Sequence, residues 1–127
     1  MSVPVPVRRR LPDERKSVTR KLVVRTADGP IKMYVTVGLF EDGSPGELFL
    51  KVDRQGSLLS GFADAVALSV SLGLQWGVPI QAFITKFRHA KFEPSGPTGW
   101  PKVPMASSLL DLLAAWLDDQ FPASDKP

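Results

Sequence analysis

The chain has 127 residues, of which 43% are hydrophobic and 23% charged, and this composition fits one globular domain with a core of its own. It contains no cysteine and a single histidine, which excludes disulfides, iron–sulfur clusters, a cysteine nucleophile and a structural zinc site built from this chain. The net charge of +3 conceals an uneven distribution, because residues 1–25 carry eight basic and two acidic groups whereas the rest of the chain is net acidic. No uninterrupted apolar run has the length of a membrane span and no secretory signal pattern opens the sequence, so we expect a cytoplasmic protein without a membrane partner.

Residues 1–19 are expected to form an extended basic arm. Its prolines remove backbone donors and disfavour a helix. The arm could contact an acidic protein or a nucleic acid, and a solvated tail is the alternative. Because the arm has no aromatic side chain to stack on a base, any nucleic-acid binding by it would be electrostatic and sensitive to salt. The candidate contact residues are Arg8, Arg9, Arg10 and Arg15.

Three β-strands are predicted after the arm, over residues 21–26, 31–40 and 47–54. Apolar residues alternate with polar ones in the second and third of these segments. Gly29 and the Asp42-Gly43 pair supply turn chemistry in the two connections. Short connections favour antiparallel neighbours, so we expect a meander with one buried face.

Two helices are predicted to follow the meander. The first would begin with Ser57 as its N-cap, run to about Trp76 and be largely buried against the sheet. Gly61 and Gly73 lie inside it at a cost in helix propensity, which predicts close backbone approach at both points. The second helix would cover residues 79–87, although the alternation of apolar residues there also allows a strand.

Residues 88–105 contain four prolines and two glycines and are predicted to be a long loop without regular structure across most of its length. A final amphipathic helix is expected to begin near Ser107 or Ser108. The spacing of Ser108 and Asp111 is that of a capping box.

The predicted organisation is one α+β domain over residues 20–121, with the arm before it and a flexible tail over residues 122–127. Its fold is a three-stranded antiparallel meander covered by a long helix, a short helix, the proline- and glycine-rich loop and a C-terminal helix. The sequence leaves the oligomeric state open, a homo-oligomer included.

The predicted ligand site lies in and beside the loop 88–105. Arginine and lysine side chains cluster there, and both bind phosphate oxygens well. Two aromatic side chains could stack on a base, so a nucleotide is one hypothesis for the ligand. Packing of the aromatic rings against the sheet, with the charges in solvent, is the alternative. The candidate ligand-binding residues are Lys86, Arg88, His89, Lys91, Phe92 and Trp100.

Three ordered stretches of the sequence resemble one protein family. They are residues 11–19 (LPDERKSVT), residues 36–49 (TVGLFEDGSPGELF) and residues 87–96 (FRHAKFEPSG). All three are similar to segments of the TSCPD domain, the C-terminal domain of class II, vitamin B12-dependent ribonucleotide reductases. Order and spacing agree from about Leu11 to Leu117, so the resemblance covers most of the chain.

The chain also departs from that family. The reductases carry a catalytic barrel with a radical-forming cysteine, a redox cysteine pair and a cysteine tail, and this chain has no cysteine. A Thr-His pair of the family is here Thr19-Arg20. No catalytic, substrate-binding or cobalamin-binding residue can therefore be carried over. The resemblance implies adenosylcobalamin only for the related full-length enzyme and assigns no cofactor or metal to this chain.

The leading functional hypothesis is a non-catalytic accessory or regulatory module in the context of deoxyribonucleotide synthesis, whose family-level activity is that of a ribonucleoside-diphosphate reductase. It would bind a nucleotide or dock on a reductase subunit through residues 86–105 and the basic arm. An electrostatic nucleic-acid binder acting through the arm is the alternative. A third hypothesis is an enzyme that uses His89 with Glu93 as an acid–base pair, although one histidine and no metal motif leave little machinery for catalysis.

Overall fold

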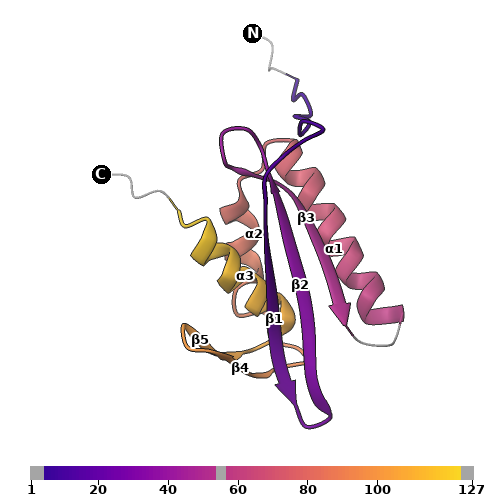
Figure 1. Cartoon of the computed structure of the whole chain (residues 1–127), viewed down its shortest axis with the longest axis vertical. Coiled ribbons are helices and arrows are strands. Elements are labelled where there is room, and N and C mark those ends of the chain that lie inside the picture. Colours follow the sequence, from indigo (N-terminus) through magenta and orange to yellow (C-terminus); the bar gives the residue numbers. More distant parts are fainter. Residues whose placement is uncertain (1–4, 54–56, 124–127) are drawn as a thin grey trace.

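The computed structural model describes residues 5–53 and 57–123, and its elements follow the predicted order with one addition (Figure 1). The α+β class and the antiparallel meander are confirmed. The capping role predicted for Ser57 and most of the predicted tail lie outside the described residues. The elements are β1 (Ser17–Thr26), β2 (Gly29–Leu39), β3 (Pro45–Asp53), α1 (Ser57–Gln75), α2 (Ile80–Phe87), β4 (Gly96–Trp100), β5 (Val103–Ala106) and α3 (Leu109–Gln120).

Strands β1, β2 and β3 form one antiparallel sheet in that order. Alternate side chains point to the helices and are buried, as in the row formed by Leu22, Met33 and Val52. β1 begins at Ser17, which pairs with Gly38, so the boundary predicted at residue 19 falls inside a strand. The strand begins earlier than predicted because the long β2 offers pairing partners to residues 17–20.

Helix α1 packs along β3 and is buried on one face only. Ala67, Val70 and Leu74 are at most 7% exposed, whereas Leu68 on another side of the helix is 62% exposed. The prediction of a largely buried helix is therefore wrong, because the sheet covers only the side of α1 that lies on it, while α2 and α3 pack mainly on each other. With a mean hydropathy of 1.4 over Leu58–Gln75, this helix could cross a membrane by length and composition alone. In the domain, 22% of this segment is buried.

The short helix α2 settles the alternative between helix and strand for residues 79–87. Pro79 was predicted to be the first residue of this helix, and it is instead the N-cap, so the helix begins one residue later, at Ile80. Its buried residues are Ile80 and Ile84. Phe83 of α2 lies against α1 at Gly73, where an added Cβ would come within 2.6 Å of the ring. The close approach predicted at Gly73 is confirmed.

The segment predicted as an irregular loop contains a two-stranded hairpin. β4 and β5 pair antiparallel, with Gly96 opposite Ala106 and Trp100 opposite Val103. The prolines of this segment did not prevent pairing, because short edge strands tolerate residues that lack an N–H donor. Thr98 closes the turn, since its hydroxyl accepts a hydrogen bond from the backbone N–H of Trp100 at 3.0 Å and donates to the carbonyl of Val103. The hairpin also contacts β1, and this tertiary contact is invisible in a local sequence pattern.

The two glycines of α1 provide a matched test of this packing. Nothing lies within 4 Å of a Cβ added at Gly61, so the close approach predicted there is wrong and Gly61→Ala should raise the free energy of unfolding by about 1 kcal/mol. Gly73→Ala gains the same helix propensity but must displace the ring of Phe83, so it should destabilise relative to Gly61→Ala. Urea unfolding of both variants measures this difference, and an equal gain at both positions would contradict the observed contact.

Candidate functional site

Asp111 joins the predicted ligand loop to the start of α3. Its carboxylate accepts hydrogen bonds from the backbone N–H of His89 at 2.7 Å and of Ser107 at 2.9 Å, and it forms an ion pair with Arg88. Ser108 is the N-cap of α3, because its hydroxyl accepts from the backbone N–H of Asp111 at 3.0 Å. The capping spacing found in the sequence is therefore real, but the carboxylate also orders residues 88 and 89.

Burial by itself would raise the pKa of Asp111, which is 2% exposed. The backbone N–H groups of Ser107 and His89 and the guanidinium of Arg88 outweigh that effect and hold the pKa of this carboxyl below its ordinary value. Asp111 is therefore charged at neutral pH. Arg88 is committed to this carboxylate, which leaves it poorly placed to grip a phosphate group.

His89 contributes to this arrangement through its backbone. It adopts φ of 68°, a left-handed conformation that is uncommon outside glycine, and this conformation directs its N–H at Asp111. Its imidazole is exposed, as are the side chains of Lys86 and Lys91. The loop-ordering hydrogen bond considered for His89 thus exists, but its donor is the main chain.

The two aromatic residues of the predicted ligand site lie at different places. Phe92 is 49% exposed and borders an apolar groove. Trp100 is partly buried against the core, and the guanidinium of Arg20 lies 5.0 Å from the centroid of its ring. The hollows beside the two rings contain none of the four predicted cationic or titratable residues. The structure therefore does not bring the six candidate residues together into one nucleotide site.

The basic arm is held against the body of the domain at Arg8 and Arg9. Arg8 donates to the side chain of Gln75 at 2.9 Å, and the backbone N–H of Arg9 donates to the carbonyl of the same residue at 2.7 Å. The guanidinium of Arg9 lies 3.3 Å from a carboxylate oxygen of Asp42 and 3.8 Å from the centroid of the Phe40 ring. Acceptors far away in the sequence therefore bind the arm at these two residues.

Arg15 is engaged as well, through a two-pronged ion pair with Glu47. Its Nη2 donates to Oε1 of Glu47 at 3.1 Å and its Nε donates to the other carboxylate oxygen. Glu47 of β3 is 8% exposed and lies opposite Gly38 of β2. A Cβ added at Gly38 would collide with the carboxylate of Glu47. Arg10, the remaining candidate, is exposed. Much of the motif in residues 36–49 therefore serves to seat the arm.

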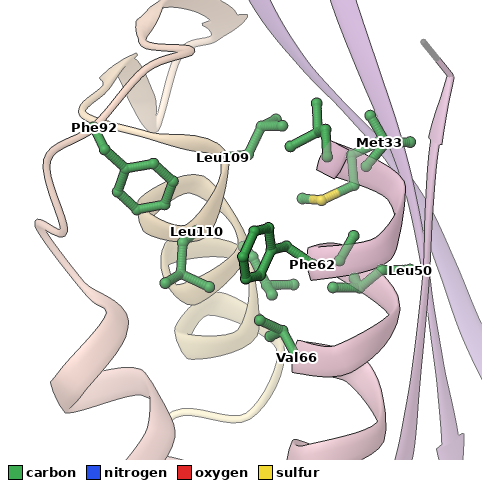
Figure 2. Close-up of a pocket in the computed structure, with 11 residues that line it drawn as sticks. Met33, Leu50, Phe62, Val66, Phe92, Leu109 and Leu110 are labelled. Atoms are coloured by element: carbon green, nitrogen blue, oxygen red, sulfur yellow. The ribbon is translucent and has the colours of Figure 1, made fainter. Parts of the chain in front are cut away.

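An apolar groove lies between the N-terminal half of α1, the sheet and α3 (Figure 2). Phe62 of α1 points toward Leu110 of α3, and Phe92 lies at the opposite rim. Met33 and Leu50 of the sheet form part of its inner wall. Its volume is about 90 Å³, and its lining is almost wholly apolar. The first turns of α1 stand away from α3 here, and no side chain in the described part of the chain fills the gap.

Sequence reasoning missed Asp111, Glu47 and Gln75 as organising residues. Asp111 had a signal, since its capping spacing placed it at the start of a helix, but the partner across the domain was not visible. Glu47 had a weaker signal: it is an acidic residue at the start of an alternating strand, where a buried acid is rare and needs a partner. Gln75 had none, because its role depends on where the arm crosses the end of α1.

The charge on Asp111 predicts a pH-dependent contribution to stability. A carboxyl whose folded pKa is depressed stabilises the fold above its unfolded pKa of about 4, and this contribution disappears as the pH falls through the folded pKa. Asp111→Asn should therefore cost on the order of 2 kcal/mol at pH 7 and much less near pH 2.

Urea unfolding of both proteins at the two pH values measures this effect. Asp42 and Asp119 also have a lowered pKa, but they titrate in both proteins, so the difference between variant and parent isolates Asp111. Equal stability of the two proteins at pH 7 would show that the carboxylate does not hold the loop.

Comparison with known proteins gives a consistent family. The model of the TSCPD domain matches residues 6–121. The chain is 39% identical over 116 residues to a vitamin B12-dependent ribonucleotide reductase of Rhodopirellula baltica, which covers 91% of this chain and 11% of that protein. It is 44% identical over 108 residues to the enzyme of the same name from Streptomyces coelicolor (85% of this chain and 11% of that protein) and 40% identical over 105 residues to that of Bradyrhizobium diazoefficiens (82% and 8%).

The chain spans about a tenth of the length of the curated relatives that it matches. No solved structure matches it significantly. The family model extends from the arm to the end of α3 and so covers the sheet, the three helices and the β4–β5 hairpin of the described structure. The chain belongs to the TSCPD domain family.

Proposed function

We propose that this chain is a non-catalytic accessory module that docks on a vitamin B12-dependent ribonucleotide reductase. The supporting observation is an apolar face on α1 that the domain itself leaves uncovered. Leu58 and Phe62 are one helical turn apart, as are Leu68 and Leu72, and Trp76 follows directly after the helix with its N–H bonded to Leu72. With 3.6 residues per turn, all five side chains fall within about a third of the helix circumference. Phe62 and Trp76 are 65% and 49% exposed.

The position of α1 makes this face accessible. The helix lies at one side of the helical layer, next to β3, while α2 and α3 pack on each other at the other side (Figure 1). The only ionisable side chain on α1 is Asp64. Phe62 belongs both to this face and to the apolar groove, so the two form one continuous surface. Contiguous apolar surfaces of this kind mark protein interfaces.

The relatives suggest what covers this surface. They are about eight times as long as this chain, so the same domain is attached there to a large reductase body. An apolar helix face that is uncovered in the isolated domain is suited to such a body. Docking would use α1 and the groove, and it would leave Lys86, Lys91 and Arg15 outside the central contact. Arg8 would lie at its border, because it shares a hollow with Leu68 and Leu72 and donates to Gln75 of α1. This differs from the surface predicted from the sequence.

Adenosylcobalamin does not fit the apolar groove. The groove of about 90 Å³ is too small for a corrin ring, and its apolar lining offers no partner to the amides of the cofactor. Within residues 5–53 and 57–123, no three His, Cys, Asp or Glu side chains are placed to hold a metal ion.

The experiment measures binding of the chain to the Streptomyces coelicolor reductase, intact and with its matching segment deleted. The deleted enzyme should bind the chain more tightly than the intact one, because its docking site is vacated. Leu68→Gln should weaken this binding about tenfold or more, since central apolar contacts of an interface each contribute more than about 1 kcal/mol.

Met105→Gln is the matched control, because Met105 is also 62% exposed but lies on the hairpin strand β5. Both substitutions are at exposed positions and should change stability by less than about 0.5 kcal/mol. Retention of adenosylcobalamin by the deleted reductase verifies that it is folded. Absence of binding to both forms of the reductase, or equal effects of the two variants, would reject docking through α1.

A further inference from the structure

The face of the sheet opposite the helices carries a second surface, which the proposed docking leaves open. Side chains on β1, β2 and β3 alternate between the buried layer and this face. Tyr34 and Phe49 lie on it and are 37% and 54% exposed. Its other described side chains, apart from the nearly buried Glu47, are exposed or partly exposed: Ser17, Thr19, Lys21, Val23, Arg25, Lys32, Thr36, Lys51 and Asp53.

The strand register places two lysines on either side of Tyr34. Lys21 of β1 is directly opposite Tyr34, and Tyr34 is directly opposite Lys51 of β3. Residues that face each other in antiparallel strands have Cβ atoms about 5 Å apart. The phenol ring therefore stands in a row between two ammonium groups, on a surface that is open to solvent.

The next row along the strands contains the second aromatic ring. Phe49 is opposite Thr36, and the hydroxyls of Thr36 and Thr19 lie 3.2 Å apart. Phe49 is thus the diagonal neighbour of Tyr34, at roughly 7 Å between their backbones. Two exposed aromatic rings on adjacent rows can accept two successive bases of an unstacked strand.

The charge of this face is positive. Among the described residues of this face, Lys21, Lys32 and Lys51 are basic, while Asp53 is an exposed acid at the far end of β3. The guanidinium of Arg25 is turned away from the face, toward Gly99 of β4. The acid at the other end is Glu47, which is nearly buried and is neutralised by Arg15.

We propose that this open sheet face binds single-stranded nucleic acid, with bases stacked on Tyr34 and Phe49 and phosphates held by Lys21 and Lys51. Aromatic rings on a sheet, interleaved with lysines, match the alternation of bases and charges in a single strand. The lysines separate the rings, so the face is not the contiguous apolar patch that a protein interface prefers. A single strand that crosses several rows of the sheet can contact both rings and both lysines, whereas a free nucleotide is too short to do so.

The test is fluorescence anisotropy of a labelled oligothymidylate of about twelve nucleotides at about 50 mM salt. Phe49→Thr should weaken binding about tenfold, because it removes one stacking ring while threonine keeps the β propensity of the strand. Phe92→Thr is the matched control, since Phe92 is 49% exposed on another part of the molecule. Equal affinities of these two variants would overturn the proposal.

The phosphate contacts have their own readout. Lys51→Gln should reduce the slope of log affinity against log salt by about 0.7, whereas Lys86→Gln on α2 should leave the slope unchanged. Three results would overturn the proposal: no binding by the parent protein, competition by duplex DNA as strong as by the single strand, or binding of mononucleotides alone. Deletion of residues 1–10 separates this face from the basic arm, because binding that is lost with the arm and insensitive to Phe49→Thr would place the contact elsewhere.

Discussion

Helix α1 meets the sheet through Ala67, Val70 and Leu74, and the sheet covers only the side of the helix that lies on it. The packing of this one face helps to close the core, since burial of apolar area is the main favourable term in folding. It also leaves Leu68, Trp76 and their neighbours in solvent. The same packing thus closes the core and leaves a surface that is suited to a larger partner. The apolar groove at Phe62 extends that surface into the space between α1 and α3.

Charged residues of this domain mainly order its own chain. Asp111 binds the backbone of residues 89 and 107 together with Arg88, and Glu47 binds Arg15 across the edge of the sheet. Removing one partner of such a buried pair leaves an uncompensated charge, so these contacts fix the loop and the arm in place. Several residues of the stretches that resemble the reductase domain therefore have structural roles: Gly38 clears space for Glu47, and Asp42 receives Arg9. They need no ligand to explain them.

Much of the fold could be predicted from local patterns. Alternating apolar residues identified the second and third strands, and capping spacing at Ser108 identified the start of α3. The hairpin β4–β5 could not be predicted, because its pairing depends on the side chain of Thr98 and on contact with β1. The exposure of α1 depends on which other elements pack against it. The placement of the candidate ligand residues could not be predicted for a related reason: Arg88 is bound by Asp111, and His89 takes a left-handed backbone conformation to reach the same carboxylate.

Amide hydrogen exchange of the chain, alone and mixed with the Streptomyces coelicolor reductase that lacks its matching segment, is the most direct measurement of docking through α1. Binding should slow exchange in residues 58–76 and near the groove at residues 109–113, because an apolar partner excludes water from both. Exchange in residues 86–91 and in residues 11–16 of the arm should stay the same. Protection confined to those two segments, with α1 unchanged, would contradict this mode of docking and restore the basic surface as the contact.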